Sequence, residues 1–391
     1  MNIRPSLAAP LCLALVLAAC SDSHETEPSE TGSYSDVEGA QETSEAQYRL
    51  VLGDADDGTV AVLDLIEESV ENIGQVDDLT GISTDGRFAY LSGGDGIHVL
   101  DSGAWTWDHG DHNHYYRATP RTVGATDVDG SAAGAFGQPT AVLDEAQHAA
   151  TVLERTALED GDVKVTSELS DVSGVAVAVG EEVLTGAPDD AGLRVRSLDG
   201  DEVTAVEETC TDPEGVARTR SGLVVGCAEG ALVLDPDDWS AEQIDYPEGT
   251  DPQDRARSFE HRPGSTVLGA LRGEDGAWAL DVRAGTWTAL DVPGAVAVSA
   301  AGEDLPVLVL DDDGMLHAFD PEEGNEEHSV ELLQDGADDE VPPVIAIDTA
   351  RAYVNDPAAG VVHEIDYADE LRTARTLELD LTPTLMVETG W

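Results

Sequence analysis

The pattern that decides the fold is seen most clearly in the stretch Gly96-Ile97-His98-Val99-Leu100-Asp101, a glycine, an apolar strand and a closing aspartate. The same phrase returns as Gly230-Ala231-Leu232-Val233-Leu234-Asp235 and as Gly276-Ala277-Trp278-Ala279-Leu280-Asp281. Looser copies run from Gly58 to Asp64, Gly192 to Asp199, Gly314 to Asp320 and Gly360 to Asp366. The chain therefore repeats one β unit many times.

The spacing of these copies predicts a β-propeller. The closing aspartates are residues 64, 101, 199, 235, 281, 320 and 366, so most intervals are 36 to 46 residues. Strand-rich repeats of this length are typical of propeller blades, and nine Asp-Gly pairs provide tight turns between strands. The long interval before residue 199 holds a degenerate unit around Ala149–Leu169. This gives eight blades, or seven if that stretch is an insertion.

The two ends of the repeat region predict how the ring closes. The first unit begins directly at Tyr48 and lacks the strand that precedes the others, whereas the last unit continues past Leu377 into Thr384-Leu385-Met386-Val387-Glu388. We expect this surplus C-terminal strand to complete the first blade, because closure removes exposed strand edges. The propeller domain is thus assigned to residues 48–391.

The charge balance excludes one class of function and indicates an environment. Acids outnumber bases 81 to 19 in 391 residues, giving a formal net charge of −62, and Lys164 is the only lysine. Nucleic-acid binding requires a basic surface, which this composition lacks. Such a charge is well screened only at molar salt. The sequence favours a halophilic protein over an ordinary acidic secreted one.

The N-terminus predicts export and lipid anchoring. Residues 7–19 are apolar but too few to span a bilayer. The following Leu17-Ala18-Ala19-Cys20 resembles the lipobox of bacterial lipoproteins, so residues 1–19 are the expected signal peptide and Cys20 the lipidated residue. A plain secretory signal is the alternative. Residues 20–47 are acidic and predicted to be a disordered tether, which places the propeller on the outer face of the cytoplasmic membrane.

Two cysteines remain after Cys12 leaves with the signal peptide and Cys20 is lipidated. Cys210 and Cys227 form an even pair in an oxidising compartment, which predicts a disulfide that closes a short loop. A metal site built on these two cysteines is less favoured, because no histidine flanks either of them.

Three of the ten histidines lie within six residues, in the segment from Asp108 to Tyr116. On an extended strand His112 and His114 point to the same side, and Gly110 allows His109 or Asp111 to approach the same point. Imidazole nitrogen and carboxylate oxygen are ligands that suit zinc in an open tetrahedral site. Nickel or copper also fit histidine ligands, and the carboxylate favours zinc.

Two structural interpretations compete with this metal site. The segment could be an exposed histidine-rich loop, or His112 and His114 could simply cap a strand beside Tyr115 and Tyr116. Other histidines are less promising: His98, His317 and His363 lie inside repeated strands, and His261 is a weak candidate for a distant ligand. No nucleophile motif, phosphate-binding glycine loop or free mature cysteine is present, so we expect no enzyme.

The segment from Asp101 to Tyr116 resembles periplasmic zinc metallochaperones of the AztD type, and the similarity extends over the repeats and both cysteines. This resemblance implies a β-propeller that passes zinc to the solute-binding protein of a zinc importer. It implies metal-site positions at His109, Asp111, His112 and His114. Such sequences carry further histidines where this chain has residues 171–174 and 212–215, and Glu214 is the expected substitute ligand.

We therefore predict that the chain is a monomeric, lipid-anchored zinc-binding protein that delivers zinc to an uptake partner. One alternative is a propeller that serves as a protein-interaction scaffold without a functional metal site. The other is a hydrolase of lactonase type that uses a metal in the central channel.

Overall fold

The computed structural model describes residue 37 and residues 39–108, 112–134, 137–188, 192–274, 276–337 and 341–391. They belong to a compact unit formed by residues 35–391. The expected signal peptide, Cys20 and most of the expected tether lie outside the described residues. In the part of the chain that is described, no helix is long and apolar enough to cross a membrane.

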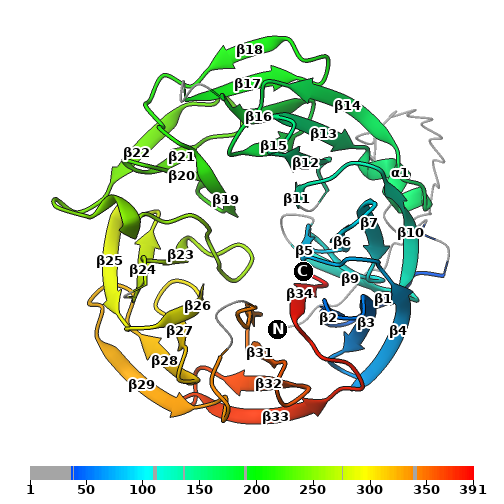
Figure 1. The fold of residues 1–391 in the computed structure, drawn as a ribbon, viewed down its shortest axis with the longest axis vertical. Coiled ribbons are helices and arrows are strands. Elements are labelled where there is room, and N and C mark those ends of the chain that lie inside the picture. Colours follow the sequence, from blue (N-terminus) through cyan, green and yellow to red (C-terminus); the bar gives the residue numbers. More distant parts are fainter. Residues whose placement is uncertain are drawn as a thin grey trace, which may run out of the picture. The chain divides into compact units, whose positions relative to one another are not determined.

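Eight antiparallel sheets follow one another around a ring (Figure 1). From the inner to the outer strand, the first sheet contains β34 (Leu385–Thr389), β2 (Arg49–Gly53), β3 (Thr59–Asp64) and β4 (Ser69–Gln75). The second sheet contains β5 (Gly81–Thr84), β6 (Phe88–Gly93), β7 (Gly96–Asp101) and β10 (Arg121–Thr126). The next two contain β11 (Ser131–Ala133), β12 (Thr140–Asp144), β13 (Ala149–Leu153) and β14 (Val165–Ser170), then β15 (Ala176–Val179), β16 (Glu182–Gly186), β17 (Leu193–Ser197) and β18 (Glu202–Ala205).

The second half of the ring repeats this arrangement. The fifth and sixth sheets contain β19 (Glu214–Thr219), β20 (Gly222–Cys227), β21 (Gly230–Leu234) and β22 (Ala241–Asp245), then β23 (Val267–Leu271), β24 (Gly276–Asp281) and β25 (Thr286–Asp291). The last two contain β26 (Ala295–Ala300), β27 (Val307–Asp311), β28 (Met315–Phe319) and β29 (Glu326–Glu331), then β30 (Ile345–Ile347), β31 (Ala352–Asp356), β32 (Val361–Asp366) and β33 (Arg372–Glu378). In the three-stranded sixth sheet, the backbone of Glu260 pairs with Gly269 on the inner side.

Hydrophobic cores lie between neighbouring sheets, which explains why the inner strands are apolar on both faces. On β27, Leu308 and Leu310 pack toward the eighth sheet, whereas Val307 and Val309 pack toward the sixth. The core between the eighth and first sheets contains residues from both ends of the chain. The predicted all-β propeller is therefore confirmed.

The C-terminal strand closes the ring. β34 pairs with β2 in antiparallel register, from Arg49 opposite Thr389 to Gly53 opposite Leu385. The hydroxyl group of Thr384 also donates to the carbonyl oxygen of Gly53 at 3.1 Å. The predicted completion of the first blade by the C-terminal segment is confirmed.

A ninth, three-stranded sheet departs from the repeat. It consists of β1 (Gln41–Thr43), β9 (Asn113–Arg117) and β8 (Ala104–Asp108), in that order. The hairpin of β8 and β9 is inserted between β7 and β10 and contributes to the long interval between closing aspartates. β1 lies within the range expected to be a disordered tether, and there it pairs with β9. Outside the strands are a short helix α1 (Arg155–Asp160) and a 3-10 turn at Pro252–Asp254.

Candidate metal centre

The sheet of β1, β9 and β8 presents His114 on a face shared with aromatic and acidic residues. In the register of the hairpin, Trp107 lies opposite His114 and Trp105 lies opposite Tyr116. On the other side of β9, Glu42 of β1 lies opposite Tyr116. Because side chains alternate along a strand, these five side chains belong to the same face of the sheet.

His112 and His114 come together beside the hairpin turn. Their ring centroids are 4.7 Å apart. His112 is exposed and His114 is partly buried. The other two positions expected in the site, His109 and Asp111, lie outside the described residues. The structure therefore juxtaposes the two histidines that were expected to share one side of the strand.

Glu42 contacts His114, and no pattern in the sequence indicated this glutamate as part of the site. Its Oε1 lies 2.6 Å from Nδ1 of His114, although the two residues are 72 positions apart. Burial, and to a smaller extent the charge of Glu42, raises the pKa of Tyr116. Glu42 had no special sequence signal, because it is one of many acids in a segment without apolar alternation.

A stacked aromatic pair lies on the same face of the sheet, at the buried end of the hairpin. Trp105 is fully buried, and its ring lies 5.3 Å from that of Tyr116 in a stacked arrangement. The guanidinium group of Arg87 lies 4.0 Å from the centre of the Trp105 ring, and Asp101 pairs with Arg87 at 2.8 Å. The base of the hairpin is thus anchored in the propeller, and the histidines lie at its exposed end.

Glu214, the expected substitute ligand, forms ion pairs with two arginines. Its Oε2 lies 2.6 Å from Nη2 of Arg255 and 2.6 Å from Nη1 of Arg257. Asp212 also pairs with Arg255. Both ion pairs use Oε2, so a metal ion would compete with two arginines for that oxygen. Among the described residues, which leave out His109 and Asp111, no three His, Cys, Asp or Glu side chains are grouped to hold a metal ion.

Four of the scattered histidines contact carboxylate or backbone groups. His317 lies 3.1 Å from Asp311 and 3.2 Å from Glu326. His363 lies 3.5 Å from Asp356, and His98 lies 2.7 Å from Asp95. His261, the weak candidate for a distant ligand, instead contacts the carbonyl oxygen of Arg218 at 3.1 Å, and burial lowers its pKa.

Cys210 and Cys227 form a buried disulfide between the loop before β19 and the end of β20. This bond lies within the core between the fourth and fifth sheets. Neither sulfur is therefore available as a thiolate ligand or nucleophile in this state.

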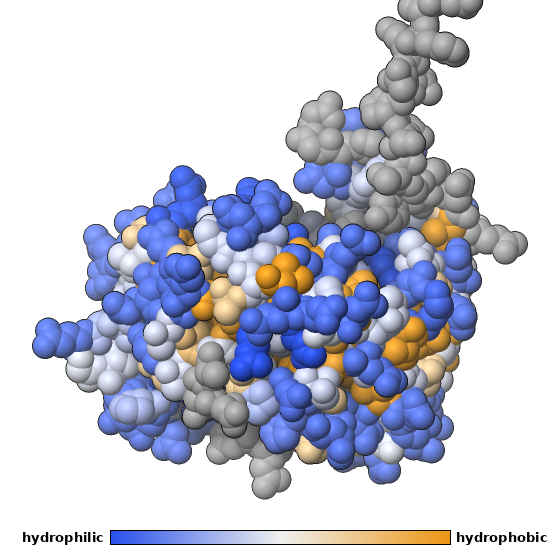
Figure 2. Space-filling view, turned by 90° about the horizontal axis from the view of Figure 1, so that it is seen from above, coloured by the Kyte–Doolittle hydropathy of each residue, from blue (hydrophilic) through white to orange (hydrophobic). Residues whose placement is uncertain are grey.

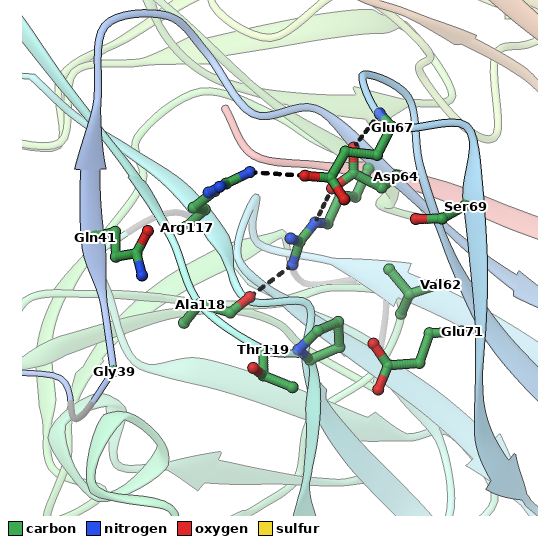
Figure 3. Close-up of a pocket in the computed structure, with 12 residues that line it drawn as sticks. Gly39, Gln41, Val62, Asp64, Glu67, Ser69, Glu71, Arg117, Ala118 and Thr119 are labelled. Carbon is green, nitrogen blue, oxygen red and sulfur yellow. Dashed lines mark hydrogen bonds and ion pairs between the residues drawn. The ribbon is translucent and has the colours of Figure 1, made fainter.

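A polar cavity of about 260 Å³ lies next to β1 (Figure 3). Arg117 and Glu67 pair across it at 3.0 Å, and Arg49 pairs with Asp64 at 3.2 Å. Gln41 lines this cavity, whereas the neighbouring Glu42 contacts His114. The cavity and the histidine face therefore lie on opposite sides of β1, and both arginines of the cavity are paired with acids of its lining.

No known protein family and no curated protein matches the chain by sequence. Solved structures do match. AztD from Citrobacter koseri is 22% identical, with a TM-score of 0.72 over 88% of this chain and 98% of AztD. The apo form of the same protein is 21% identical, with a TM-score of 0.73 over the same shares. BamB from Moraxella catarrhalis is 13% identical, with a TM-score of 0.52 over 82% of this chain and 92% of BamB. The resemblance to AztD-type proteins is confirmed at the level of the fold.

Proposed function

We propose that this chain is an extracytoplasmic protein that binds zinc at the hairpin of β8 and β9 and passes it to the solute-binding protein of a zinc importer. The observation that carries the proposal is the pair of rings of His112 and His114, 4.7 Å apart beside the hairpin turn. The fold shared with AztD supports the same function.

The donor set fits zinc as cargo rather than as a permanent cofactor. His112 and His114 offer imidazole nitrogens, and His109 and Asp111 belong to the same hairpin segment. Mixed nitrogen and carboxylate ligands suit zinc and leave a position open. Because His112 is exposed, ligands of a partner protein can enter that position before the hairpin ligands leave. This exchange breaks no covalent bond, so the proposed activity is not enzymatic.

The location of the protein belongs to the same proposal. A lipid on Cys20 would hold a monomeric propeller on the outer face of the cytoplasmic membrane, where an uptake partner collects zinc. The acidic segment between Cys20 and β1 would let the propeller stand away from the membrane surface.

The direct test is a zinc titration of the purified protein against a competing chelator, in molar salt so that weak attraction to the acidic surface is screened. We expect about one zinc per chain. Binding should weaken in acid, because protonated imidazole cannot ligate zinc. Substituting both His112→Ala and His114→Ala should abolish tight binding.

The matched control is the double variant His317→Ala and His363→Ala. These histidines also contact carboxylates but lie in strands of the ring, so zinc affinity should stay at the parent value. Tight binding that survives loss of His112 and His114 would place the site elsewhere. Absence of tight binding in the parent would favour the scaffold function, and turnover of a lactone would favour the hydrolase.

A further inference from the structure

β1 holds an acidic side chain in contact with the proposed zinc site. Three residue pairs join β1 to β9, and the hydroxyl group of Thr43 donates to the carbonyl oxygen of Tyr115 at 3.2 Å. This pairing fixes the backbone of Glu42 opposite Tyr116. The side chain of Glu42 then reaches diagonally along β9 to His114, on the same face.

The contact uses one particular nitrogen of the imidazole ring. Oε1 of Glu42 lies 2.6 Å from Nδ1 of His114, which is at the short end of hydrogen bonds between a nitrogen donor and a carboxylate, typically about 2.7–2.9 Å. A neutral imidazole carries one N–H donor and one acceptor nitrogen. If the Nδ1–H group donates a hydrogen bond to Glu42, then Nε2 keeps the lone pair that a metal ion requires.

We infer that Glu42 is the positioning residue of His114: its carboxylate holds the Nδ1–H tautomer and the ring orientation that present Nε2 to zinc. Carboxylates that accept from the second nitrogen of a ligating histidine raise its basicity in this way. The inference rests on the proposed zinc site. It assigns a role in metal binding to a strand that the sequence indicated only as part of a tether.

The chain offers a matched control two residues beyond β1. Glu45 carries the same charge in the same exposed segment. Its backbone carbonyl accepts from Thr43 and Gln47, and those bonds do not depend on its side chain. Replacing Glu45 therefore removes the same formal charge from this segment as replacing Glu42, without removing the contact to His114.

The test measures zinc affinity by chelator competition in molar salt for the parent, Glu42→Ala, Glu42→Gln and Glu45→Ala. We expect Glu42→Ala to weaken binding about 10- to 100-fold. Glu42→Gln keeps an acceptor oxygen and should recover much of this loss, and Glu45→Ala should bind like the parent. An equal loss of zinc affinity in Glu42→Ala and Glu42→Gln would instead indicate that Glu42 is a direct ligand, which overturns the inference.

A second readout needs no metal. Nitrogen-15 NMR of the zinc-free protein reports which nitrogen of His114 carries the proton. We expect the Nδ1–H form to dominate in the parent and in Glu45→Ala, and a mixture of forms in Glu42→Ala. An unchanged tautomer or unchanged zinc affinity in Glu42→Ala overturns the inference. If the parent binds no zinc, the proposed function fails, while the NMR comparison still decides whether Glu42 controls His114.

Discussion

In five of the seven repeats, the side chain of the closing aspartate accepts a hydrogen bond from the turn that follows it. One oxygen of Asp281 accepts the backbone N–H groups of Arg283 and Ala284, each at 2.9 Å. Asp64 binds two N–H groups of its own turn in the same way, both at 3.0 Å. Aspartate is favoured at such positions because its short side chain can satisfy turn donors. The regular spacing that predicted the blades thus has a local cause.

Partners of single residues could be predicted only where they are close in sequence. The clustering of His112 and His114 made them visible as a candidate site. The contact of Glu42 with His114, and that of Glu214 with Arg255, join residues 72 and 41 positions apart. No local pattern encodes such pairs, because they arise from the way strands and loops meet in the ring.

A residue-level prediction concerns Glu388 on β34, which is buried beside Asp348. Its Oε1 has no hydrogen-bond partner among the described residues. Burial, and then the charge of Asp348, raise its pKa well above the ordinary value of 4.5. A raised carboxyl pKa means that stability is full below about pH 4.5 and falls as the pH rises toward the folded-state pKa.

Replacing Glu388→Gln removes this titration. We expect the variant to be about 1–3 kcal/mol more stable than the parent at neutral pH and equal to it near pH 4. The measurement is urea unfolding at several pH values, with the exposed Glu378→Gln as control. A variant less stable than the parent at neutral pH would show that the carboxylate is favourable where it lies.

At the scale of elements, strands with a strong apolar pattern were predictable and β1 was not. β34 continues the repeat beyond its last full unit, so its pairing with β2 followed from counting strands. β1 has the sequence Gln-Glu-Thr and both glutamine and glutamate are exposed. Only the hairpin of β8 and β9, which begins 61 residues after the end of β1, gives this segment an edge with which to pair.

Deleting residues 384–391 tests the role of β34. The deletion exposes the hydrogen-bonding edge of β2 and uncovers the core between the eighth and first sheets. Unpaired strand edges promote association between chains, so we expect loss of cooperative unfolding and aggregation. Circular dichroism melts and light scattering would measure this. A truncated protein that melts like the parent would argue that the ring does not depend on this strand.

At the scale of the whole molecule, the acidic surface dominates the electrostatics. Figure 2 shows hydrophilic side chains over much of the face in view. Several arginines are bound by more than one acid, as Arg375 is by Glu364 and Glu68. With 81 acids and only 19 bases, most carboxylates have no basic residue to neutralise them, and their repulsion opposes the folded state.

The salt dependence of stability follows from this excess. Lowering the salt from about 1 M to about 0.1 M lengthens the screening distance from roughly 3 to 10 Å. We expect the melting temperature to fall markedly over this range, as calorimetry in sodium chloride would show. Repeating the scan in potassium chloride separates screening from binding of a particular cation. A constant melting temperature would contradict salt adaptation.

The central claim is that zinc binds at the hairpin of β8 and β9. Anomalous diffraction from crystals of the zinc-loaded protein, recorded on both sides of the zinc absorption edge, locates the metal without assumptions about its ligands. We expect one strong peak in contact with His112 and His114, and no comparable peak beside Glu214 or His317. A dominant peak in the central channel, or none at the hairpin, would show that the proposed zinc site is wrong.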